Sequence, residues 1–301
     1  MTYLTKEDWE KNFVQKICDD KSWSALIKEN LKIESCFVFL INKLFNPKNK
    51  ENFQNKKLLK EILFPSLIFF HKYTLSSGIS LSNLTYKDTL TLCITCIYLS
   101  LKAVNKLIHL EEISKRFQSL FNKDENIIYE IEDINNLIID KEFEILLLIQ
   151  FDINFDCPFR NYYLIKKYLG KIKQSEEMIK TIVKYVNTKI SKTIFFPFNL
   201  YFTSIEIIIS SLLLVAKENK LNFIDINDLI KMNNLDVDKN NIIECCTLMN
   251  RIIKYINYLE EMKKKNINNN MQENINFGAI VTLQSNNWVH DMNIIFLFFA
   301  F

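Results

Sequence analysis

Residues 90–102 read LTLCITCIYLSLK, and this stretch decides the fold. Apolar side chains occur on nearly every side of a helix drawn through it, and only its last residue, Lys102, is charged. A helix without a polar face is stable in water when other helices surround it. Thr85 or Asp88 provides a suitable cap for its start. We therefore predict a helix over residues 85–103 at the centre of a helical domain.

A second stretch of the same character, IEIIISSLLLVAK, occupies residues 205–217, 115 residues after the first. Three pairs of residues are identical at this offset: Ile94 and Ile209, Leu99 and Leu214, and Lys102 and Lys217. In each half of the chain the apolar helix is the third of about five predicted helices. The repeat predicts an all-α protein with two tandem five-helix domains, each wrapped around a buried central helix.

Apolar residues recur with helical periodicity along the rest of the chain, and no stretch alternates with period two as a strand would. Residues 122–140 look like a charged connecting segment, and Pro65 predicts a kink or a break in the helix that contains it. The other helices are predicted over residues 5–20, 22–46, 57–75, 108–121, 138–151, 159–174, 175–193, 203–219, 224–234 and 239–262.

The helices suggest four parts along the chain. Residues 1–24 are expected to form a flanking N-terminal helix. The first domain is expected over residues 25–157 and the second over residues 158–262, up to the end of the last predicted helix. Residues 263–301 contain an Asn-rich run that cannot bury apolar area, and we expect a disordered C-terminal tail there.

Composition excludes several classes of function. With only 3 glycines among 301 residues, the chain has no glycine-rich loop of the Walker or Rossmann kind to hold a phosphate. Its 38 basic and 35 acidic residues give a net charge of +3, too small to indicate a nucleic-acid partner. Seven cysteines without a signal-peptide pattern predict reduced thiols in the cytosol or nucleus. The apolar run at residues 294–301 is far shorter than the ~20 residues of a membrane span.

No group of residues forms a recognisable catalytic or metal site. Cys93 and Cys96 form a CxxC, but they lie inside an apolar helix without a nearby histidine, so we interpret them as core residues. The chain has three histidines, and none is four residues from another: His71, His109 and His290. We therefore predict a non-catalytic protein without a cofactor or a metal ion.

Two charged residues stand at the edges of apolar helices. Lys102 closes the first central helix, and Glu142 is expected near the start of the helix over 138–151. From the residues alone an ordinary explanation suffices, since a lysine can extend its ammonium to water and a glutamate is favoured at a helix N-terminus.

Three segments, in this order, resemble the motifs of the cyclin family. Residues 69–77 (FFHKYTLSS) resemble the segment with a YFxRFYL core, and residues 90–102, ending CIYLSLK, resemble the LFLAxK helix. Residues 142–151 (EFEILLLIQF), followed by Asp152-Ile153 and Pro158-Phe159-Arg160, resemble the ExxLLxxLxFxL…PYR stretch. The ordered set is more specific than any one motif. The resemblance covers about residues 25–262 and looks closest to transcription-type cyclins of the cyclin H kind, with cyclin C next.

The resemblance implies two cyclin-box domains and a regulatory subunit that activates a cyclin-dependent protein kinase. Lys102 and Glu142 match the family's lysine–glutamate pair that binds kinase main chain near helix αC, and Leu146 and Phe151 match its apolar contacts. A cyclin H-like role implies a CDK-activating and RNA polymerase II C-terminal-domain kinase, with a RING-type assembly factor as a third subunit. It also implies a nuclear location, with a cytoplasmic pool as an alternative, and roles in the cell cycle or in transcription.

The chain departs from the family pattern at several points, and two other functions stay open. His71-Lys72-Tyr73 replaces Arg-Phe-Tyr, Glu206 stands where a small alanine is usual, and the substrate-docking Met-Arg-x-x-Leu patch is absent from residues 28–46. Ala103-Val104-Asn105 follows the hallmark lysine in place of an acidic residue. A transcription-factor-IIB-like nucleic-acid-binding module is one alternative, although it would need a basic face. A helical scaffold without a kinase is the other.

Overall fold

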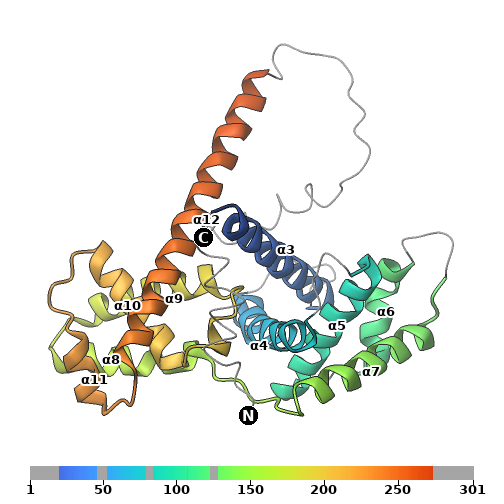
Figure 1. Ribbon diagram of the computed structural model, residues 1–301, viewed down its shortest axis with the longest axis horizontal. Helices are drawn as coiled ribbons and strands as arrows, with labels where there is room; N and C mark the ends of the chain where they lie inside the picture. The colour runs from blue at the N-terminus through green and yellow to red at the C-terminus, as the bar shows by residue number, and fades with distance from the viewer. Residues whose placement is uncertain (1–19, 46–52, 79–83, 107, 123–127, 274–301) are drawn as a thin grey trace. The chain divides into compact units, whose positions relative to one another are not determined.

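The computed structural model describes residues 20–45, 53–78, 84–106, 108–122 and 128–273, and within these ranges every regular element is helical (Figure 1). Ten α-helices and two short 3₁₀-helices occur there. In chain order they are α3 (Asp20–Phe45), α4 (Phe53–Ser77), α5 (Tyr86–Ala103), α6 (Leu110–Phe121), α7 (Ile131–Leu148), η3 (Pro158–Asn161), α8 (Tyr162–Lys171), α9 (Glu176–Thr193), η4 (Phe198–Leu200), α10 (Ser204–Glu218), α11 (Ile226–Asn233) and α12 (Lys239–Glu273).

Among the described residues the chain divides into two compact units: residues 28–156 form the first, and residues 20–27 with those from Cys157 onward form the second. The first unit contains α3 from Lys28 onward and α4 to α7, and the second contains the start of α3 and α8 to α12. The two helices predicted to be central, α5 and α10, are each the third of five. The all-α class and the two tandem groups of five helices, which the internal repeat predicts, are therefore confirmed.

Helix α5 is the core of the first unit. It begins where the sequence predicts, because the Thr85 hydroxyl accepts a hydrogen bond from the backbone N–H of Asp88 at 3.1 Å. Eleven of its 18 residues are buried, and it packs chiefly against α4 and α7. Small hydroxyl side chains allow the close approach to α4, where the Ser66 hydroxyl donates to that of Ser100 at 2.9 Å.

Helix α10 has the same role in the second unit, where it packs against α9 and α12. Its start explains why Glu206 replaces a small residue of the cyclin pattern. The Glu206 carboxylate accepts hydrogen bonds from the backbone N–H of Thr203 at 2.8 Å and from the Asn241 side chain at 3.0 Å, and the residue is 4% exposed. Glu206 thus caps α10 and fastens α12 to it.

Helix α7 corrects one prediction. It begins at Ile131, inside the segment expected to connect two helices, and not at residue 138. The Asp133 carboxylate accepts from the backbone N–H of Glu130 at 2.9 Å and caps the start, and Ile134 lies fully buried in the first turn. The sequence did not indicate this start, because the charged residues of the first turn, Glu132 and Asp133, lie on the solvent side of the helix. Glu142 consequently lies in the middle of α7, so the helix-start explanation for it is wrong.

The ends of three other helices also differ from the prediction. Helix α4 runs through Pro65 as one helix, so of the predicted kink or break the break does not occur, and the helix ends at Ser77, directly before Gly78, whose φ is +65°. The helix predicted from residue 159 starts with the 3₁₀ turn η3. Helix α12 continues to Glu273, past the expected end at residue 262. The predicted helix over residues 5–20 and the tail beyond residue 273 lie outside the described residues.

Candidate functional site

Lys102 and Glu142, which the sequence places 40 residues apart, form an ion pair on the surface of the first unit. The Lys102 ammonium lies 2.6 Å from Oε1 and 2.9 Å from Oε2 of Glu142. Lys102 is in the last turn of α5 and Glu142 is in the middle of α7. The packing of α5 against α7 brings the two residues together. The helix dipole of α5 also stabilises the cation in its last turn.

The pair is partly sheltered from water. The side chain of Lys102 is 41% exposed and that of Glu142 is 13% exposed. The Lys102 ammonium also lies 4.2 Å from the centre of the Tyr98 ring. Partial burial lowers the pKa of Lys102, but the hydrogen bond and charge of Glu142, with Tyr98, outweigh this and raise it. The lysine is thus charged at neutral pH and, with three donors, can bind both Glu142 and a partner's carbonyl group.

Next to this pair, α7 carries apolar side chains on its outer side. Its buried side is formed by Ile134, Ile138 and Ile145, so these outer residues add nothing to the core. We call four exposed apolar residues, spaced four residues apart, the α7 stripe: Ile139 (48% exposed), Phe143 (59%) and Leu147 (52%) lie on α7, and Phe151 (58%) follows its end. The helical part of the stripe, from residue 139 to 147, is about 12 Å long at ~1.5 Å per residue.

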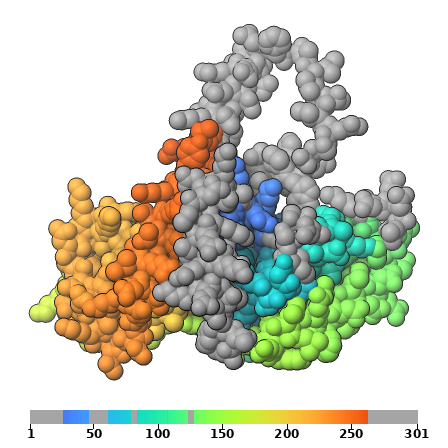
Figure 2. Space-filling view, in the orientation of Figure 1, coloured from blue at the N-terminus to red at the C-terminus, as the bar shows by residue number. Residues whose placement is uncertain are grey.

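The stripe is unusual among the described residues. Six of the 16 exposed large apolar side chains there fall between residues 139 and 153. Single exposed apolar residues are ordinary, but a contiguous exposed patch is typical of an interaction surface. Helix α7 lies at the surface of the first unit, where Figure 2 shows it in green. The arrangement provides an apolar surface with one polar anchor at its edge.

The C-terminal end of α7 determines where the stripe ends. The backbone N–H of Phe151 donates to the carbonyl of Leu146 at 2.7 Å, and that of Gln150 donates to the carbonyl of Leu147 at 3.0 Å. Gln150 and Phe151 have φ values of 53° and 57°, and no other adjacent pair in the described residues has positive φ. This conformation costs an L-residue about 1–2 kcal/mol, and glycine usually occupies the first of these positions. The turn therefore needs support from other contacts.

The four site residues expected from the sequence have different positions in the structure. It joins Lys102 to Glu142, leaves Leu146 half-buried beside the pair, and exposes Phe151 beyond the helix end. Sequence reasoning missed the other three members of the stripe, Ile139, Phe143 and Leu147. The available signal was an apolar series at four-residue spacing in addition to the series that forms the core.

The second unit repeats only part of this arrangement. Lys217 ends α10 as Lys102 ends α5, and it is exposed. Lys217 forms no ion pair with any residue that the structure describes, whereas Lys102 is paired with Glu142. The lysine–glutamate pair beside an apolar stripe is thus a feature of the first unit.

The cysteines of α5 belong to the core. Cys93 and Cys96 are buried, and burial raises the pKa of the Cys96 thiol. Cys36 of α3 shares a hydrogen bond with Cys93, which also raises the pKa of Cys93. Across the described part of the chain, no three His, Cys, Asp or Glu side chains lie close enough together to hold a metal ion. In the same ranges, no helix has the length and hydropathy needed to cross a membrane.

Comparisons with known proteins find similarity in structure and not in sequence. No family model matches the sequence, and no curated protein matches it. The chain is similar to a chain in the structure of the CAK complex from Chaetomium thermophilum bound to ATP-γ-S, with a TM-score of 0.49 and 12% sequence identity. The alignment covers 86% of this chain and 82% of that chain. At these values the similarity establishes neither a function nor a partner.

Proposed function

We propose that this protein is a non-catalytic, cyclin-type subunit that binds and activates a cyclin-dependent protein kinase. The observation that carries the proposal is the Lys102–Glu142 ion pair, which lies beside the exposed α7 stripe. The ordered sequence motifs, which resemble those of cyclins, support it independently. An apolar surface with a charged anchor fits a protein partner better than it fits a small substrate or a nucleic acid.

The proposed mechanism is a conformational bias on the kinase. A protein kinase is active when the glutamate of its helix αC pairs with the lysine of strand β3. A partner that binds only this arrangement moves the equilibrium toward it by the difference between its affinities for the two states. Moving a 1:99 mixture to 99:1 requires a difference of about 5.5 kcal/mol, which is within reach of a protein interface with a well-packed centre.

The residues divide this work by their chemistry. The stripe contributes apolar area that packs against one side of αC. Lys102 donates to main-chain carbonyls next to αC, and Glu142 holds the lysine side chain in position and accepts from main-chain N–H groups. Leu146 and Phe151 extend the apolar contact on either side of Leu147. The pair fixes the register of docking, because a charged group buried at an interface is costly unless its hydrogen bonds are made.

The finer assignment follows the resemblance. A cyclin H-like chain would serve a kinase that phosphorylates other cyclin-dependent kinases and the C-terminal domain of RNA polymerase II. Such a complex would work in the nucleus and would hold a RING-type assembly factor as its third subunit. No cofactor is needed in this role, since the kinase supplies the chemistry.

The test uses the full chain and a panel of purified cyclin-dependent kinases, including the kinase subunit of a CDK-activating complex. Binding is measured by calorimetry, and phosphoryl transfer is measured on a peptide of C-terminal-domain repeats and on an activation-loop peptide. We expect one kinase to bind in a 1:1 ratio and its activity to rise at least tenfold. No binding to any member of the panel would contradict the proposal. Binding without activation would favour a scaffold.

A further inference from the structure

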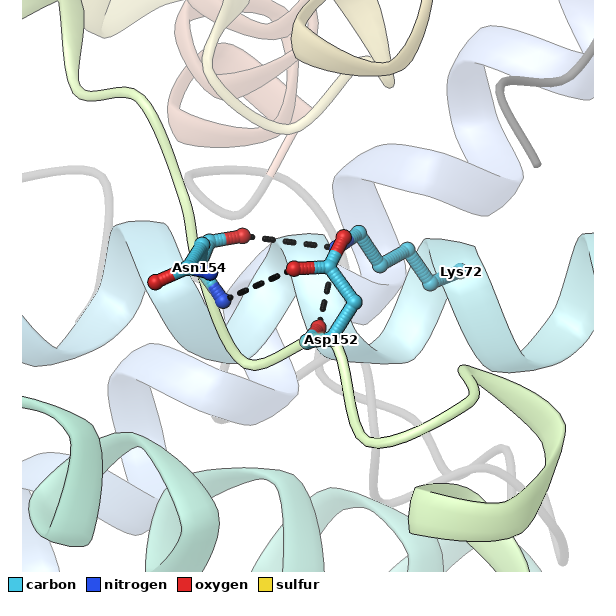
Figure 3. Close-up of polar contacts among 3 residues, drawn as sticks. All are labelled: Lys72, Asp152 and Asn154. Atoms are coloured by element: carbon cyan, nitrogen blue, oxygen red, sulfur yellow. Dashed lines mark hydrogen bonds and ion pairs between the residues drawn. The ribbon is translucent and has the colours of Figure 1, made fainter. Parts of the chain in front are cut away.

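Lys72 of α4 holds the chain segment that follows α7 (Figure 3). Its ammonium lies 3.1 Å from the Oδ2 carboxylate oxygen of Asp152, 3.1 Å from the Asp152 carbonyl oxygen and 3.4 Å from the Asn154 carbonyl oxygen. The other carboxylate oxygen of Asp152 accepts from the backbone N–H of Asn154 at 3.2 Å. One lysine thus fixes both the side chain and the backbone of a turn.

This contact is sheltered and begins one residue after Phe151. The side chains of Lys72 and Asp152 are 20% and 24% exposed, so the ion pair is less screened by water than an ordinary surface pair. Gln150 and Phe151, directly before it, hold the two adjacent left-handed conformations. Strained backbone of this kind persists where neighbouring contacts over-determine it, and it concentrates at functional sites.

The residues on both sides of the strained turn pack inward, since Ile149 is buried and the Phe155 ring lies 6.3 Å from that of the buried Phe64, whereas the Phe151 ring within the turn is 58% exposed. The direction of the Phe151 ring depends on the left-handed conformation of its own residue, because a change of φ there would change the direction of its Cα–Cβ bond relative to α7. Through its contacts with Asp152 and Asn154, Lys72 therefore controls the position of the Phe151 side chain, which it does not itself bury.

We propose that Lys72 is a positioning residue, which holds the turn after α7 so that Phe151 completes the α7 stripe for the kinase. The inference rests on the proposed function and deepens it, because it assigns to α4 a part in the docking surface. Lys72 acts through Asp152 and Phe151 and does not itself touch the kinase.

A double-mutant cycle with the kinase tests this role. Kinase affinity is measured for Lys72→Met, Phe151→Ala and the combination of the two. We expect about a tenfold loss for Phe151→Ala and about a fivefold loss for Lys72→Met, with no further loss when Lys72→Met is added to Phe151→Ala. A lysine with a general structural role would lower affinity by the same factor in both backgrounds. Lys72→Arg, which can still donate to Asp152, should restore most of the affinity.

Lys106→Met is the matched control, because Lys106 pairs with Glu61 in the same unit at 2.9 Å and lies away from the turn. We expect it to leave kinase affinity unchanged. Amide hydrogen exchange without kinase should be faster at Phe151 and Asn154 in Lys72→Met than in the wild type. Wild-type affinity in Lys72→Met, or equal losses in Lys72→Met and Lys106→Met, would contradict the positioning role of Lys72 and leave the proposed function unaffected. If the wild type binds no kinase, the proposed function fails and the inference fails with it.

Discussion

At the scale of single residues, the structure gives a physical reason for Glu206, which departs from the residue usual in the cyclin pattern. Its carboxylate is almost fully buried, and it accepts one hydrogen bond from the start of its own helix and one from Asn241. The sequence marked the position as unusual because a charged group replaced a small one. The spacing of Thr203 and Glu206 is that of a capping box, but only the structure shows the bond from Asn241, which is 35 residues away.

We expect Glu206→Ala to lower the free energy of unfolding by about 2 kcal/mol, because it removes a cap and leaves two donors without their acceptor. Denaturant unfolding measures this change. Glu218→Ala on the same helix, which removes a half-exposed partner of Lys189, should cost about 0.5 kcal/mol or less. Kinase affinity should be unchanged in both variants, and equal destabilisation by the two would contradict the capping role.

The Lys72–Asp152 contact predicts how the free energy of unfolding depends on pH. Burial raises the pKa of Asp152, but the hydrogen bond and charge of Lys72, with Asn154, outweigh it and lower the pKa below its ordinary value. A carboxyl group with a lowered folded-state pKa stabilises the fold above its unfolded pKa of about 3.9, and this contribution is lost as the pH falls through the folded value. Unfolding free energy should therefore fall more steeply below pH 4 in the wild type than in Asp152→Asn. Parallel curves would contradict the contact.

At the scale of elements, the sequence predicts helices best where capping and burial agree. Helix α5 combines a Thr85 cap with apolar residues on all sides, and its predicted bounds are confirmed. Helix α7 was shortened in the prediction because its first turns carry Glu132 and Asp133 on the solvent side. Its apolar outer side was missed because apolar periodicity does not distinguish residues that face the core from those that face a partner.

Two substitutions on α7 test whether its apolar outer side binds a partner or packs within the protein. We expect Phe143→Gln with Leu147→Gln to lower kinase affinity at least tenfold, because the pair forms the centre of the proposed interface. The melting temperature should stay unchanged or rise slightly, because both side chains are more than half exposed and glutamine favours helices.

Ile243→Gln on α12 is the control for these substitutions, since Ile243 is 62% exposed and lies in the other unit. It should change neither the melting temperature nor kinase affinity. A drop in melting temperature for the α7 variant, with kinase affinity equal to that of the control, would show that the stripe packs within the protein.

At the scale of the whole molecule, the internal repeat gave the architecture, because a buried central helix requires a similar set of helices around it in each half. The function depends on how the two halves differ. A lysine stands at the end of both α5 and α10, but of these two lysines only Lys102 has a glutamate partner among the described residues. Identity at a repeat offset could not reveal this difference, because the partner comes from another helix that packs nearby only in the folded chain.

The central claim is that the first unit binds a kinase through Lys102 and Glu142. The most direct test measures kinase affinity and melting temperature together for Lys102→Ala and Glu142→Ala, with Lys189→Ala as the control. Lys189 also joins two helices by an ion pair, to Glu218, but in the second unit. Truncating one member of a charged pair at an interface typically costs 2–5 kcal/mol.

We therefore predict at least a 30-fold loss of kinase affinity for each variant of the pair, at ~1.4 kcal/mol per factor of ten. Their unfolding free energies should stay within about 1 kcal/mol of the wild type, and Lys189→Ala should bind the kinase like the wild type. Wild-type affinity in both Lys102→Ala and Glu142→Ala, with a lowered melting temperature, would contradict the claim and leave the pair only a role in joining α5 to α7.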